Sequence, residues 1–312
     1  MSEGEQTSSL LSSLKAFIVA PLIFIIILGA IFAYSGIWPP LVVIESKSMQ
    51  HDAYQASDYV GPSSIGAIDT GDIVIVKEVN GLGDVVTYVE GATSGFETYG
   101  EYGDVVIYYK SGMAKPIIHR AIVELEYNET GGGFDVPSLL DLPDDAWSVS
   151  PGPQQVWNLQ GFLILYDVGY AEVTVSIDLN AMLDTMGSNA HGGLITMGDN
   201  NWYTNNQGGN IGRYDQGFLS VKEPIEGDWV IGKARGELPW FGLLKLWFTG
   251  TAPEYTPPNS QTNLFITLGV VIGVPIVLDT ANTLLKKRGV HMFGWTGKLS
   301  TRRLWTRLKG KR

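Results

Sequence analysis

Residues 104–127 read DVVIYYKSGMAKPIIHRAIVELEY and contain two runs dense in Val, Ile and Tyr on either side of a Gly-containing turn. Runs of this composition, punctuated by Gly, Asp and Asn, are typical of short β-strands. The same composition recurs at 72–79, 84–90, 161–168, 171–178 and 228–237, whereas helical periodicity is weak outside 178–186. Residues 39–262 are therefore predicted to form a mainly β domain of several short strands.

Two stretches of this domain are predicted to be irregular. Residues 127–157 contain NETGGG, LPDD and SPGPQQ, which are typical of turns, and predict a long loop. Residues 249–262 read TGTAPEYTPPNSQT, and their Pro and Thr content predicts a linker.

Two apolar segments flank the domain. Residues 16–38 are 23 residues without a charged side chain, and a helix needs about 20 to cross a bilayer core. Residues 264–278 are 15 apolar residues that the flanking positions extend to 263–285. We expect both to be transmembrane helices. A cleaved signal peptide is the alternative for the first, but its apolar stretch is too long and no clear A-x-A site follows.

The charge is distributed unevenly along the chain. The formal net charge of −11 argues against nucleic acid as the main partner. Residues 286–312 carry ten Lys/Arg and no Asp/Glu, whereas residues 39–262 carry 29 Asp/Glu against 10 Lys/Arg. The positive-inside rule predicts a cytoplasmic tail, which with two spans also puts residues 1–15 in the cytoplasm and 39–262 outside. We therefore expect a two-span plasma-membrane protein that has the lipid bilayer as a partner.

Residues 46–52 read SKSMQHD and place two serines shortly after the first predicted span. A serine nucleophile needs a base within hydrogen-bond reach, a group that orients this base, and donors for the oxyanion. The chain has no cysteine, which excludes a thiolate nucleophile and disulfides. The candidate bases are His51, His119, His191 and His291, with Lys115 as a rival.

His119 is the favoured base because the run 116–127 that contains it predicts a rigid strand. Taken alone, a histidine on an apolar strand is more often structural. The acid can come from residues 195–217, where Asp199 follows Gly198 and Asp215 follows Tyr214. On local sequence alone, this Gly- and Asn-rich stretch favours a long hairpin with Asx turns.

In order along the chain, these pieces resemble type I signal peptidases, and more closely the branch of archaea and of the endoplasmic reticulum. The resemblance covers residues 46–242 and rests on five motifs. They are Ser-Lys-Ser-Met at 46–49, GDIVIV at 71–76 with GDVVIY at 103–108, PIIHRA at 116–121, TMGDNN at 196–201, and VIGKARGELPWFG at 230–242. The bacterial branch has Lys where His119 stands, so this chain resembles the Ser/His type.

The resemblance implies a β-rich catalytic domain and a serine endopeptidase that cleaves signal peptides of exported preproteins after small residues at −1 and −3. Ser48 is the implied nucleophile and His119 the implied base. Ser46 and Met49 are assigned to oxyanion and substrate binding, with the Ser48 N–H as an alternative oxyanion donor. No cofactor or metal is expected, and the export machinery is a candidate partner.

The chain departs from the family pattern at three places. Gln50 and His51 stand in the Met-x-Pro positions, and Asn205 stands where the family has its acid. Because the family often places that acid before Gln, Asp215-Gln216 predicts that Asp215 orients His119, with Asp199 as the alternative acid. Residues 127–193 are predicted to be an inserted β-rich subdomain between core segments 39–126 and 194–248.

Two other readings stay open. The first is a catalytically inactive family member that serves as a membrane-anchored peptide-binding or scaffold protein, motivated by Asn205 and the missing proline. The second is another processing protease with the same dyad, acting for example on surface-layer or pilin precursors.

Overall fold

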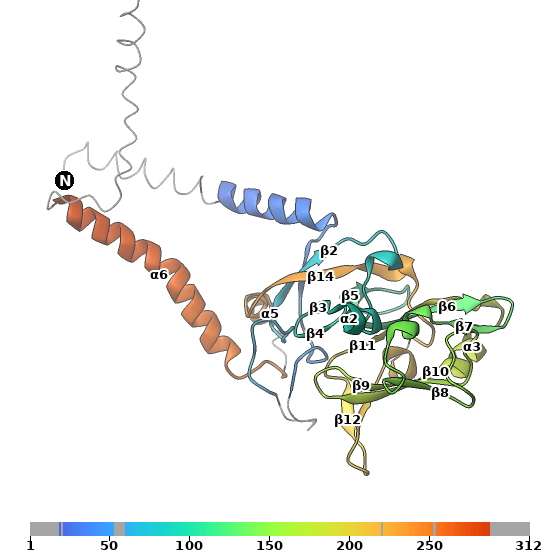
Figure 1. Ribbon diagram of the computed structural model, residues 1–312. Coiled ribbons are helices and arrows are strands. Elements are labelled where there is room, and N and C mark those ends of the chain that lie inside the picture. Colours follow the sequence, from blue (N-terminus) through green and yellow to red (C-terminus); the bar gives the residue numbers. More distant parts are fainter. Residues whose placement is uncertain (1–18, 20, 53–59, 220, 252–253, 288–312) are drawn as a thin grey trace, which may run out of the picture. The chain divides into compact units, whose positions relative to one another are not determined.

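The computed structural model describes residues 19, 21–52, 60–219, 221–251 and 254–287. The chain separates into two compact units, Met1–Gln261 and Thr262–Arg312. The first unit is mainly β and carries the sheets drawn in Figure 1. The prediction of a mainly β domain is therefore confirmed.

The first sheet has seven strands, and all of its strand pairs are antiparallel. Its path runs β1 (Leu41–Val43), β2 (Ile73–Lys77), β14 (Val230–Leu238), β5 (Val105–Tyr108), β6 (Ile117–Asn128) and β11 (Gly193–Met197), and β7 (Gly133–Asp135) pairs with the end of β6. Side chains alternate along β2, where Val74 and Val76 are buried, as expected for a strand with one face on the core.

The second sheet has five strands, in the order β12 (Trp202–Thr204), β13 (Asn210–Gly212), β10 (Val173–Asp178), β9 (Phe162–Val168) and β8 (Trp147–Ser150). Its inner face shares one apolar core with the second half of β6, and this core includes Ile122, Leu125, Leu163, Val175 and Ile177. A small hairpin, β3 (Glu97–Thr98) and β4 (Glu101–Tyr102), lies beside the first sheet (Figure 1).

Most predicted elements are confirmed. The runs at 72–79, 104–110, 116–127, 161–168, 171–178 and 228–237 each contain a strand, and 178–186 contains α3 (Leu179–Met186). The Asp178 carboxylate caps α3 by accepting from the Ala181 N–H. The second sheet joins the predicted insertion, residues 127–193, to residues 202–212 through the parallel pairing of β10 with β13.

The prediction of a strand at 84–90 is wrong. This run begins at the last residue of a short 3₁₀ turn (Leu82–Asp84) and continues into the start of α2 (Tyr88–Ser94). The Thr87 hydroxyl and the Glu90 side chain form a capping box, and Gly95 ends the helix in the left-handed conformation. The capping residues therefore outweigh the β propensity of the three valines in this run, of which Val85 and Val89 are buried.

The prediction of a long loop at 127–157 is wrong in part. This stretch contains the end of β6, β7, a 3₁₀ turn (Pro137–Asp141) and β8. Strand pairing orders this stretch: β7 forms a hairpin with the end of β6, β8 pairs with β9, and Phe134 exchanges backbone hydrogen bonds with Leu159. Of the predicted linker 249–262, residues 250–259 lie between α5 (Gly242–Thr249) and α6 (Ser260–Lys287), and residues 260–262 are the start of α6. Residues 252–253 are outside the described part.

α6 contains the predicted span 263–285. Its residues Ser260–Leu285 form the one helix within the described part that is long and apolar enough to cross a membrane. Only 6% of the most apolar 18-residue stretch of this helix is buried. A shorter apolar helix covers Pro21–Ser35, inside the predicted span 16–38. The start of that span, residues 1–15 and the tail from residue 288 lie outside the described residues.

Candidate active site

Ser48 lies on the segment that follows β1. The neighbouring Met49 side chain is 1% exposed and packs into the apolar core of the first sheet with Ile44 and Ile68. The next residue, Gln50, accepts a hydrogen bond from Thr70 Oγ1 at 2.6 Å. Buried neighbours on the C-terminal side therefore fix the backbone that carries Ser48. The prediction that Met49 contacts substrate is wrong for its side chain, which belongs to the core.

His119 lies on β6 and reaches Ser48. Its Nε2 atom is 2.9 Å from Ser48 Oγ, and the residue is 5% exposed. The backbone pairing of β5 with β6, Val106 opposite His119, fixes its position on the sheet. The Ser48 carbonyl accepts from the Asn200 N–H at 2.8 Å, which ties the nucleophile segment to the turn after β11.

Asp215 completes a hydrogen-bonded chain with these two residues. It begins α4 (Asp215–Phe218), is fully buried, and places Oδ2 at 2.7 Å from His119 Nδ1. The same oxygen accepts from Tyr108 OH and from Thr196 Oγ1, each at 2.7 Å. Burial, together with the charge of Asp215, raises the pKa of Tyr108, so the phenol remains a donor.

This arrangement defines the roles of the two imidazole nitrogens. Because the Asp215 carboxylate accepts at Nδ1, that nitrogen carries the proton of the neutral imidazole. Nε2 then has a free lone pair directed at the Ser48 hydroxyl. A serine, a base on a strand and a buried carboxylate in this order have the geometry required to activate a hydroxyl nucleophile.

The other predicted site residues are placed differently. Ser46 is exposed, and its hydroxyl is 3.3 Å from Ser48 Oγ. Lys115 is exposed and pairs with Glu45 at 2.6 Å, so it is engaged away from the Ser48 hydroxyl. His191 lies 3.6 Å from Glu223 and 3.5 Å from Glu226. His291 lies outside the described residues.

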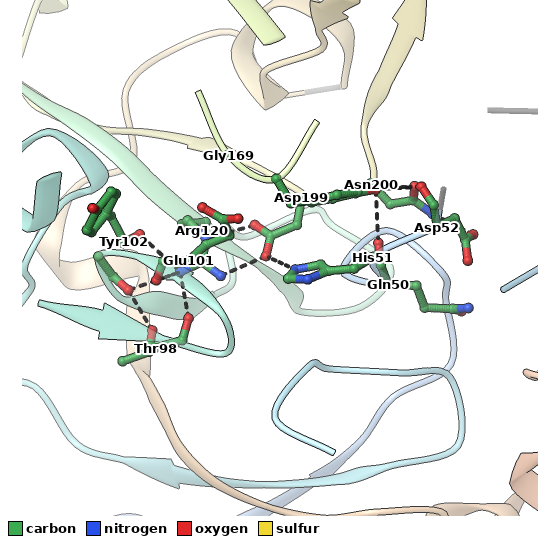
Figure 2. Close-up of polar contacts among 12 residues, drawn as sticks. Gln50, His51, Asp52, Thr98, Glu101, Tyr102, Arg120, Gly169, Asp199 and Asn200 are labelled. Carbon is green, nitrogen blue, oxygen red and sulfur yellow. Dashed lines mark hydrogen bonds and ion pairs between the residues drawn. The ribbon is translucent and has the colours of Figure 1, made fainter. Parts of the chain in front are cut away.

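Asp199 belongs to a second polar network, shown in Figure 2. Arg120 donates to both of its oxygens, at 2.8 and 2.7 Å, and His51 Nε2 is 3.0 Å from Oδ2. Burial raises the pKa of Asp199, but the charge and hydrogen bonds of Arg120 and the bond from His51 lower it to about 2. Asp199 is therefore an ionised partner of Arg120, and Asp215 is the carboxylate at His119.

An apolar groove of about 530 Å³ opens at Ser48. Its lining is mostly apolar and comes from β1, Ile44, Ile107 and Pro116–His119, with Ser46 and Ser48 at one end. The charged side chains of the lining are Glu45, Lys115 and Lys245, and both lysines pair with Glu45. β1 pairs only with β2 in the described part of the chain, and β11 pairs with β6 from Arg120 onward. Residues 117–119 therefore pair with β5 on one edge, and their second edge faces no strand among the described residues.

Tyr108, Thr196 and Asn200 were not predicted as parts of the site. Each lies within a motif quoted above, GDVVIY or TMGDNN, so the motifs themselves were the available signal. In the described residues, no group of three or more His, Asp or Glu side chains is arranged to hold a metal ion. The expectation of a cofactor-free protein stays a prediction.

Comparison with protein-family models gave no match for this chain, and comparison with curated proteins gave none either. A functional assignment therefore rests on the residues and their geometry.

Proposed function

We propose that the protein is a membrane-bound serine endopeptidase that removes N-terminal signal peptides from exported preproteins. The observation that carries this proposal is the hydrogen-bonded chain from Ser48 through His119 to Asp215, at the mouth of an apolar groove. The order of motifs along the sequence supports the same function.

The reaction proceeds through an acyl-enzyme. Ser48 Oγ attacks the scissile carbonyl carbon while His119 Nε2 takes the hydroxyl proton, and Asp215 stabilises the resulting imidazolium. His119 then gives this proton to the leaving amine, and the peptide C–N bond breaks. Water then attacks the ester carbonyl while His119 takes a proton from it. His119 returns this proton to Ser48 Oγ as the ester C–O bond breaks and the acid product leaves. The Ser46 hydroxyl, beside Ser48 Oγ, is a suitable donor to the oxyanion.

The groove suits an extended peptide. The outer edge of β1 and the second edge of residues 117–119 both line it, and each offers backbone groups to a third strand. Side chains of such a strand alternate, so those at −1 and −3 point the same way. A preference for small residues at these two positions is what the family resemblance implies.

The membrane arrangement is part of the proposal. α6 and the helix that includes Pro21–Ser35 act as two anchors, and both termini lie in the cytoplasm. The acidic domain between them lies outside the plasma membrane, on the side to which exported chains are delivered. The export machinery is a candidate partner, and the Ser/His pairing favours the branch found in archaea and the endoplasmic reticulum.

The alternative of an inactive scaffold was motivated by Asn205, which stands where the family has its acid. That motive depends on Asp215 being unable to reach His119. The distance of 2.7 Å between Asp215 Oδ2 and His119 Nδ1 speaks against that motive. The second motive, the missing proline after Met49, is independent of this distance, and the cleavage assay separates the active enzyme from the scaffold.

The proposal is tested by incubating the purified protein in detergent with a secretory preprotein and locating the cut by mass spectrometry. We expect a single cut, with small residues at positions −1 and −3 of the preprotein. A matched preprotein with Leu at −1 is expected to remain intact. Cleavage of pilin or surface-layer precursors without cleavage of secretory preproteins would instead favour a different processing protease.

A further inference from the structure

A second pocket borders Ser48. It differs from the apolar groove in its cations, because Lys115 and Lys245 of the groove both pair with Glu45. It has a volume of about 320 Å³ and is lined by Lys47, Arg213, Asn200, Asn201, Trp202 and Tyr255, together with Glu45, Ser46 and Ser48. We call it the cationic pocket. The three residues Glu45, Ser46 and Ser48 line both cavities, so the nucleophile lies at their junction.

The two cations of this pocket belong to the minority of their domain's Lys and Arg residues that form no ion pair within the described part of the chain. Residues 39–262 contain ten Lys/Arg in a background of 29 Asp/Glu, and six of the ten form ion pairs with carboxylates. Lys47 and Arg213 have no ion pair among the described residues. Their recorded partners are aromatic rings: Tyr255 for Lys47, and Tyr203 and Phe218 for Arg213.

These ring contacts hold the cations without neutralising them. The Arg213 guanidinium carbon lies 4.6 Å from the Tyr203 ring centroid and 5.8 Å from that of Phe218. A guanidinium on a ring face keeps its N–H donors available, and their fork matches a carboxylate. Lys47 Nζ lies 4.9 Å from the Tyr255 centroid. The one carboxylate of the pocket, Glu45, already pairs with Lys115 and Lys245.

We infer that the cationic pocket is a subsite for an acidic side chain on the leaving-group side of the scissile bond. This inference rests on the proposed endopeptidase function. The acyl side of the substrate, the apolar signal peptide, occupies the apolar groove. Because the scissile bond lies at Ser48, the chain beyond it enters the other cavity at that residue. An Asp or Glu there replaces water at two cations that have no protein counter-ion in the described structure.

The test uses substrate peptides that share one signal sequence and carry Glu or Gln at each of the first three positions after the cut. For the wild type we expect kcat/KM to favour Glu about fivefold at one of these positions. The double variant Lys47→Gln/Arg213→Gln is expected to bring the Glu-to-Gln ratio to about one. The double variant Lys77→Gln/Lys222→Gln removes two positive charges outside the pocket and is the matched control, with the wild-type ratio retained.

A binding measurement separates this inference from the proposed function. The Ser48→Ala variant is titrated with the same peptides, and we expect tighter binding of the Glu peptide that weakens as salt is added. Equal cleavage and equal binding of the Glu and Gln peptides at all three positions would overturn the subsite and leave the protease intact. Cleavage of no peptide by the wild type, with the Glu preference in binding retained, would overturn the protease alone.

Discussion

Asp215 is the residue on which the proposed mechanism depends most at the residue scale. Its Oδ2 atom accepts from His119, Tyr108 and Thr196, three donors on three different strands. These donors hold the carboxylate in one orientation, and the carboxylate in turn holds the imidazole toward Ser48.

Replacing Asp215 by Asn tests this role. An amide of the same shape carries no charge to stabilise the imidazolium and favours the wrong tautomer of His119, so we expect kcat to fall by about 10⁴-fold. The rate of preprotein cleavage in detergent measures the effect. Asp199→Ala, if stably folded, is expected to retain far more activity because Asp199 contacts Arg120 and His51 instead. An inactive Asp199→Ala beside a fully active Asp215→Ala would reverse the assignment.

Asp199 should instead determine stability in acid. Its folded pKa of about 2 lies below the ordinary value near 3.9, so its contribution is present above about pH 4 and is lost as the pH falls toward 2. Asp199→Asn leaves buried Arg120 without its counter-charge. We therefore expect the free energy of unfolding to fall by about 3 kcal/mol near pH 7. Thermal unfolding from pH 7 to pH 2 is the measurement. The difference in melting temperature between wild type and variant should become smaller below pH 4. A difference that stays constant with pH would contradict this account.

The sequence allowed the triad partners to be predicted, but not the groups around them. Asp215 was identifiable from the Asp-Gln pair, although the family position is occupied by Asn205. The convergence of Tyr108 and Thr196 on Asp215 depends on how β5, β6 and β11 pair in space. That register is set by long-range packing, which local patterns do not encode.

At the scale of elements, the turn between β11 and β12 packs against the backbone of the nucleophile Ser48. A Cβ atom on Gly198 would lie 2.5 Å from the Ser48 carbonyl oxygen and 2.9 Å from His119 Nε2. Asn200, two residues later, binds the same carbonyl oxygen through its N–H. Only a glycine therefore allows the backbone to approach the dyad this closely.

Gly198→Ala is expected to separate Ser48 from His119 and to lower kcat by about 10²-fold or more, since a displacement near 1 Å has effects of that size. The matched control is Gly83→Ala, because a Cβ there meets nothing within 4 Å. Cleavage rates and far-ultraviolet circular dichroism of both variants are the measurements. Full activity of a folded Gly198→Ala protein would show that the turn does not constrain the dyad.

Element predictions succeeded where pattern and pairing agree, and failed where capping or the pairing of very short strands decides. The run 116–127 forms β6 as predicted, whereas 84–90 contains the start of α2 because of the Thr87–Glu90 capping box. β7 and β8 lie inside a stretch rich in turn residues and are ordered by pairing with β6 and β9. Such short strands have too few residues for a recognisable alternation.

At the scale of the whole molecule, the proposed topology makes a labelling prediction. The chain has no cysteine, so a single introduced cysteine is an unambiguous reporter. Ser94→Cys, on the exposed part of α2, is expected to react with a membrane-impermeant maleimide in intact cells. Ser300→Cys, in the basic tail, is expected to react only after permeabilisation. If only Ser300→Cys is labelled in intact cells, the topology is the opposite of the one proposed.

The central claim is that Ser48 is the nucleophile of a signal-peptide-cleaving enzyme. The most direct measurement compares preprotein cleavage by wild type, Ser48→Ala and Ser46→Ala under identical conditions, with product masses determined. We predict that Ser48→Ala yields no mature product, while Ser46→Ala retains slower cleavage at the same bond because only one oxyanion donor is lost. Mature product formed by Ser48→Ala at the wild-type rate would contradict the account.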